Sequence, residues 1–117
     1  MIDGNWTMIE GEADGQDLAE DVLNNSKLAI ANDRHTVTLG DELLKGTHAL
    51  DTTASPLQID ATDEVGPFAG QTLAGIFKVE GDLFSVCFAG PGEERPTEFT
   101  TKSGTGKLCH VWKRQES

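Results

Sequence analysis

The chain has 117 residues, enough for one domain with a modest hydrophobic core, and we expect a single domain over residues 1–117. It carries 20 acidic and 9 basic residues, for a formal net charge of −11. Because an acidic surface repels phosphate backbones and anionic lipid headgroups, we expect neither a nucleic acid nor a membrane as partner. No basic segment precedes an apolar run, so we expect a cytoplasmic protein, or an exported one if a leader has been removed.

The first third of the chain combines a strand pattern with one short helical pattern. Trp6 and Met8 alternate with polar or outward positions, which is typical of a strand with one buried face. Residues 17–25 then change to a helical period, with Asp17 placed to cap a short helix. We therefore expect one short helix after the first strand.

Glycine, asparagine and proline residues divide the rest of the chain into short apolar runs with a period of two. The strands that this pattern predicts cover residues 27–32, 35–39, 43–50, 57–61, 73–79, 83–88, 97–101 and 107–113. We expect eight or nine short strands in all. Since closing the sheet removes its exposed edges, the pattern favours an all-β fold, a single up-and-down antiparallel barrel.

The two cysteines, Cys87 and Cys109, both lie in apolar, strand-like runs. Cysteines in this setting are more often small core or surface residues than members of a disulfide, and cytosolic proteins rarely keep disulfides. We expect the two thiols to be unbridged. A bridge would form only if their two strands were neighbours in the sheet.

The three histidines fall on three different predicted strands, a distribution that does not favour a metal centre. His35 and His48 lie on consecutive strands and could approach each other, whereas His110 points to the face opposite its neighbour Cys109. We expect no metal, no cofactor and no catalytic residue. Arg95, in a loop of acidic residues, is expected to pair with a carboxylate and pin that loop.

Several short motifs occur in an ordered set along the chain: Gly4-Asn5-Trp6, Gly46-Thr47-His48, Gly75-Ile76-Phe77 and residues 87–99, which read CFAGPGEERPTEF. This set resembles the lipocalin-like domains described mainly from planctomycetes, a bacterial family that largely lacks an assigned activity. The resemblance extends from Gly4 to Arg114 and implies a lipocalin-like barrel. It also implies structural roles for Gly4, Trp6 and Arg114, with the arginine lying over the tryptophan ring.

A barrel of about eight strands can fill itself with side chains or hold one small ligand. We expect a non-enzymatic barrel that binds a small apolar molecule at one end. The residues expected to contact that ligand are Trp6, Met8, His48, Phe77, Phe84 and Val86. Two alternatives stay open. One is a self-filled barrel that binds a protein partner through its acidic surface or loops, and the other is a hydrolase or isomerase that uses His48 or a carboxylate at the barrel mouth.

Overall fold

The computed structural model describes residues 2–66, 68–99, 101 and 107–115. These residues form nine strands and one short helix. In chain order the elements are β1 (Gly4–Ala13), β2 (Gln16–Asp17), α1 (Glu20–Asn24), β3 (Lys27–Ala31), β4 (Arg34–Leu39), β5 (Glu42–Asp51), β6 (Leu57–Val65), β7 (Thr72–Glu80), β8 (Leu83–Phe88) and β9 (Leu108–Arg114). The alternation of apolar and polar residues therefore predicted nearly every strand.

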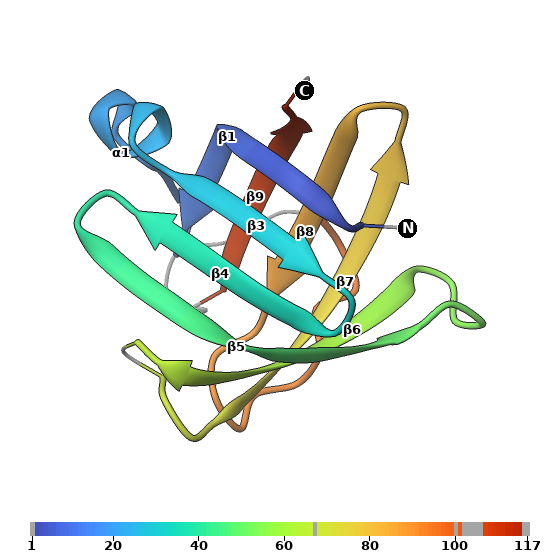
Figure 1. Cartoon of the computed structure of the whole chain (residues 1–117). Helices are drawn as coiled ribbons and strands as arrows, with labels where there is room; N and C mark the ends of the chain where they lie inside the picture. Colours follow the sequence, from blue (N-terminus) through green and yellow to red (C-terminus); the bar gives the residue numbers. More distant parts are fainter. Residues whose placement is uncertain (1, 67, 100, 102–106, 116–117) are drawn as a thin grey trace.

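Antiparallel pairing between neighbours runs from β1 through β3 to β9, and β9 returns to pair with β1. Figure 1 shows the blue first strand beside the red last strand, although they are about a hundred residues apart in sequence. The predicted all-β, up-and-down antiparallel barrel is confirmed for the described residues. Because the sheet closes on itself, its strands present one inner face to the core and one outer face to solvent.

The helix is shorter than the sequence pattern predicts. Asp17 does not cap it, because Gln16 and Asp17 pair with the end of β1 as a small hairpin. The helix begins at Glu20, with Ala19 at the N-cap position and no side-chain hydrogen bond to the cap. Among the residues that the structure describes, no helix is long and apolar enough to cross a bilayer.

One end of the barrel, which we call the closed end, holds the first residues of β1 and the last residues of β9. Trp6 is fully buried there, and its indole N–H donates to the carbonyl of Ile2 at 3.0 Å. The guanidinium carbon of Arg114 lies 4.1 Å from the Trp6 ring centroid, so the expected cation–π contact is present. Gly4, with φ +132°, leaves room for that guanidinium, since a Cβ here would lie 2.7 Å from Arg114 Nη1.

Residues 97–101 were predicted to be a strand, and over their described members they are not. Residues 89–99 and 101, which we call the strap, instead run across the outer face of the barrel without regular structure. Pro96 offers no N–H for a ladder, and the Arg95 side chain holds the strap in place. Its guanidinium donates to the carbonyls of Ile59 and Gly75 and to Asp60 Oδ1 at 2.7 Å. The prediction that Arg95 pins its loop to a carboxylate is confirmed.

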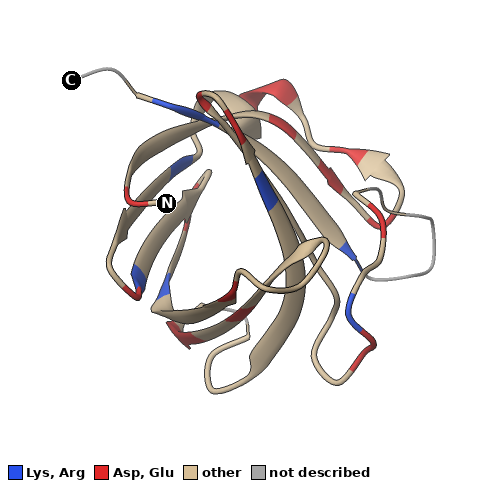
Figure 2. Cartoon of the chain, turned by 90° about the vertical axis from the view of Figure 1, so that its right-hand side faces the viewer, with Lys and Arg blue, Asp and Glu red and all other residues tan. Residues whose placement is uncertain are grey.

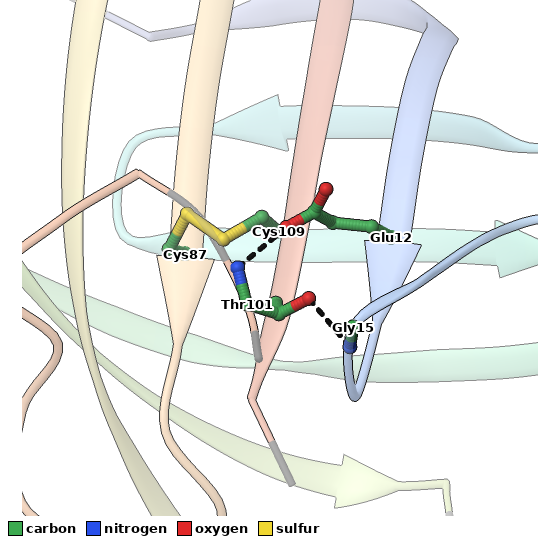
Figure 3. The surroundings of a disulfide bond; sticks show 5 residues. All are labelled: Glu12, Gly15, Cys87, Thr101 and Cys109. Carbon is green, nitrogen blue, oxygen red and sulfur yellow. Dashed lines mark hydrogen bonds between the residues drawn. A yellow bond between two sulfur atoms is a disulfide. The ribbon is translucent and has the colours of Figure 1, made fainter. Parts of the chain in front are cut away.

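The expectation of unbridged thiols is wrong, because Cys87 and Cys109 form a disulfide. The two residues lie directly opposite each other on β8 and β9, with their Cα atoms 4.0 Å apart. The strap covers this outer face, where Phe99 packs against the cysteines. Figure 3 shows the disulfide with Thr101 of the strap beside it. In the same view Thr101 N–H donates to Glu12, and the Thr101 hydroxyl accepts from Gly15 N–H at 2.8 Å.

Candidate functional site

The other end of the barrel, the open end, contains a cavity of about 240 Å³. Its walls are mostly apolar and come from the inner faces of β3 to β9 and the loop between β6 and β7. Leu39, Leu44, Phe68, Phe88 and Leu108 surround it where the strands end. An engineered apolar cavity of about 150 Å³ accepts benzene, so this cavity has room for a ring with a short side chain.

The structure divides the six residues expected to contact a ligand into two groups. His48, Phe84 and Val86 line the cavity, whereas Trp6, Met8 and Phe77 do not. Those three are buried in the main hydrophobic core cluster. Phe84 connects the two groups, because its ring contacts the rings of Trp6 and Phe77 and also faces the cavity. Phe84 is thus part of the cavity floor.

Three polar side chains on the cavity wall form a chain of hydrogen bonds. His35 Nε2 lies 2.8 Å from Asp63 Oδ1, and His35 Nδ1 lies 3.1 Å from His48 Nδ1. The two imidazole rings are stacked, with centroids 5.4 Å apart. The side chains of His35 and Asp63 are each 9% exposed, and His48 is 7% exposed. The predicted approach of His35 to His48 is confirmed, and Asp63 is a third member that the sequence did not reveal.

Gly46 explains why these groups meet. In the sheet register Gly46 on β5 lies between His35 on β4 and Asp63 on β6. A Cβ at Gly46 would lie 2.0 Å from the Thr62 carbonyl oxygen, so β5 and β6 could not approach so closely with any other residue here. The pairing of β5 with β6 also shifts register beside Gly46. This shift and the close approach of the two strands bring the His35 imidazole to the Asp63 carboxylate across Gly46.

The carboxylate of Asp63 fixes the donor of the first hydrogen bond in this chain. A carboxylate only accepts, so His35 donates from Nε2 to Asp63 Oδ1, and one of the two facing Nδ1 atoms of His35 and His48 donates to the other. His48 Nε2 is sealed by surrounding atoms and has no hydrogen-bond partner among the described residues. Burial lowers the pKa of His48 and the neighbouring His35 lowers it further, although the Asn32 carbonyl opposes this effect. His48 therefore orients His35 and does not itself offer a nitrogen to the cavity.

His110 occupies the opposite wall of the cavity. It lies on β9, which is four strands away from β5 around the eight-strand closed barrel, and its ring contacts Trp112 edge to face at 5.8 Å. Burial inside the barrel lowers the pKa of His110 to about 4. Part of its side chain is still exposed, because that part borders the cavity. No described residue donates to or accepts from its ring nitrogens, so a neutral imidazole with one donor and one acceptor faces the cavity.

Sequence reasoning missed His35, Asp63 and His110 as cavity residues. A signal for His35 and His110 existed, since both alternate with outward residues on predicted strands. Asp63 had no such signal, because aspartate is usually exposed and this one is buried only through its pairing with His35.

Among the described residues, no group of three or more His, Cys, Asp or Glu side chains is arranged to hold a metal ion. The site is therefore an apolar cavity with two polar positions on opposite walls. No protein-family model, curated protein or solved structure matches this chain.

Proposed function

We propose that this protein is a small-molecule binding barrel, related to the lipocalin-like domains, that holds a mainly apolar ligand in the cavity at its open end. The observation that supports this most is the combination of an apolar cavity of about 240 Å³ with the ring of His110 on its wall, which bonds to no described residue. A barrel built only for stability would fill this space with side chains, because empty volume lowers stability.

The ring of His110 on the cavity wall supports a binding role for the cavity over a purely structural one. Buried polar groups are normally hydrogen-bonded within the protein, and His110 is not bonded to any described residue. A ligand that brings a complementary polar group would satisfy it. The alternative of a protein-interaction domain fits less well, since a self-filled barrel was its premise and the interior has a cavity.

We also propose that the protein works in an oxidising compartment. The support is the Cys87–Cys109 disulfide, and the described part of the chain contains no free cysteine. Disulfides persist mainly outside the reducing cytosol. This favours the exported alternative of the sequence-based expectation over the cytoplasmic one.

Native mass spectrometry of the protein as purified tests the binding proposal directly. We expect a species heavier than the bare chain by the mass of one small molecule. In parallel, tryptophan emission is followed while neutral ring compounds with short side chains, 2-phenylethanol among them, are added. Trp112 lines the cavity and Trp6 does not, so binding should change the emission of Trp112. A bare mass together with no emission change for any compound would overturn the proposal.

A pair of matched variants shows whether the cavity is the binding site. Ala61→Phe places a ring into the cavity, whereas Ala29→Phe places the same ring on the exposed outer face of β3. We expect Ala61→Phe to abolish binding with little loss of stability, because the new ring fills existing space. Ala29→Phe should bind like the unmodified protein. Equal binding by both variants would locate the ligand elsewhere.

A further inference from the structure

We propose that the ligand is a small organic cation, a primary amine on an apolar or aromatic body, whose ammonium group pairs with Asp63. This inference rests on the proposed binding function and adds the chemical class of the ligand. It follows from the charge, the hydrogen bonding and the aromatic content of the cavity wall.

Asp63 is a buried carboxylate whose hydrogen bonding is incomplete among the described residues. Its side chain is 9% exposed, and of its two carboxylate oxygens only Oδ1 is paired, with His35 Nε2 at 2.8 Å. No described residue donates to Oδ2. That oxygen is not sealed by protein either, since His48 Nε2 is the only such sealed and unpartnered side-chain atom among the described residues. A buried carboxylate is costly unless it is fully paired, so Asp63 has capacity for one more donor from the cavity.

The charged groups around Asp63 favour a cationic ligand over an anionic one. Among the described residues, the ionisable side chains that line the cavity are two carboxylates, Asp63 and Glu42 at the mouth, and three histidines, with no lysine or arginine. His110 on the opposite wall is kept neutral by burial. The whole chain has a formal charge of −11, and Figure 2 shows acidic positions spread over strands and turns with few basic ones between them. Such a field attracts a cation and repels an anion.

The apolar part of the cavity wall is rich in aromatic side chains. Four aromatic residues face the cavity: Phe68, Phe84, Phe88 and Trp112. Aromatic faces attract ammonium groups as well as apolar rings, and a cation gains most from them where water is excluded. A carboxylate beside aromatic walls in an enclosed space is thus suited to an amine. The neutral imidazole of His110 can bond a second polar group at the far end of the same molecule.

The test compares three ligands of nearly equal shape on the unmodified protein: 2-phenylethylamine, 2-phenylethanol and phenylacetate. Binding is measured by isothermal titration calorimetry at pH 7.5 and low salt, where the three are cationic, neutral and anionic. We expect the amine to bind about tenfold or more tightly than the alcohol, the factor typical of a hydrogen bond to a charged partner. The anion should not bind. Added salt should weaken the binding of the amine and leave the binding of the alcohol unchanged.

Two variants with the same change in charge locate the effect. Asp63→Asn keeps an acceptor for His35 and removes the charge, whereas Asp82→Asn makes the same change in the turn at the closed end. We expect Asp63→Asn to lose the preference for the amine and Asp82→Asn to keep it.

The outcomes separate this inference from the proposal on which it rests. Equal or tighter binding of the alcohol, or an amine preference that survives Asp63→Asn, overturns the ligand class and leaves the binding function standing. No binding of any of the three compounds, with a bare mass in native mass spectrometry, overturns both. The comparison of ligands on the unmodified protein stays decisive even if Asp63→Asn fails to fold.

Discussion

The two ends of this barrel are built differently although the same strands form both. At the closed end the interior is filled by large side chains, and the polar atoms of Trp6 and Arg114 are hydrogen-bonded within the protein. At the open end the interior contains a cavity, and an imidazole and a carboxylate oxygen keep unused hydrogen-bonding capacity. The difference indicates that dense packing stabilises the closed end, whereas the proposed binding function belongs to the open end of the same sheet.

An end that keeps a cavity loses the packing that would hold its strands together, and here the outer face replaces part of that packing. The strap and the disulfide lie outside β7 to β9, and their contacts are Phe99 on the cysteine pair, Arg95 on β6 and β7, and Thr101 on the β1–β2 hairpin. The open end is therefore stabilised from outside, which leaves its inside free. This arrangement can be tested by weakening each end in turn.

The largest effect is expected at the closed end. Phe77→Ala removes a fully buried ring from the packed core and should lower the free energy of unfolding by about 3–5 kcal/mol. Phe88→Ala removes the same ring from the cavity wall, where it is only partly buried, and should cost about 1–2 kcal/mol less. Urea denaturation of the two variants measures the difference. Equal losses would contradict the division of the barrel into a packed end and an open one.

The second effect concerns the outer support of the open end. The disulfide joins residues 22 positions apart, and its removal should lower the free energy of unfolding by about 3 kcal/mol. We expect the double variant Cys87→Ala/Cys109→Ala to show this loss in urea denaturation. It should also bind 2-phenylethylamine more weakly than the unmodified protein. A reductant should destabilise the unmodified protein and have no effect on the double variant, which serves as its control. Unchanged stability in both experiments would show that the bridge does not support the barrel.

The smallest effect is a pH dependence that originates at the cavity wall. The pKa of His110 is about 4 in the folded protein and near 6.5 when unfolded, so the unfolded chain binds more protons between these values. Stability should therefore fall as the pH drops from 6.5 towards 4, by at most about 3 kcal/mol, and His110 should have no influence above pH 6.5. His110→Phe should remove this part of the fall.

The measurement is the unfolding free energy of both proteins at several pH values between 4 and 8. The difference between them isolates His110, because the many carboxylates of the chain titrate in both. If the two curves run parallel, the imidazole is not buried in its neutral form.

The sequence was informative wherever local chemistry decides the structure. Alternation placed Trp6 and Met8 on one face of β1, and the same argument put Phe84 and Val86 on one face of β8. It was less informative where a local preference competes with pairing. Asp17 is a good helix cap in isolation, yet its backbone is used by the hairpin with β1. Residues 97–101 have a strand-like pattern, yet Pro96 and the Arg95 anchor make residues 97–99 and 101 part of the strap.

What the amino-acid sequence determined by itself is the all-β barrel, because period-two alternation and turn residues act over a few neighbouring positions. The contact of Arg114 with Trp6 was implied by resemblance and needed the closure of β9 onto β1 to form. Only the tertiary structure decided the disulfide, the pairing of Asp63 with His35 and the place of His110 in the cavity wall. Each of these depends on which strands lie side by side or face each other, at separations of 22 residues or more that no local pattern records.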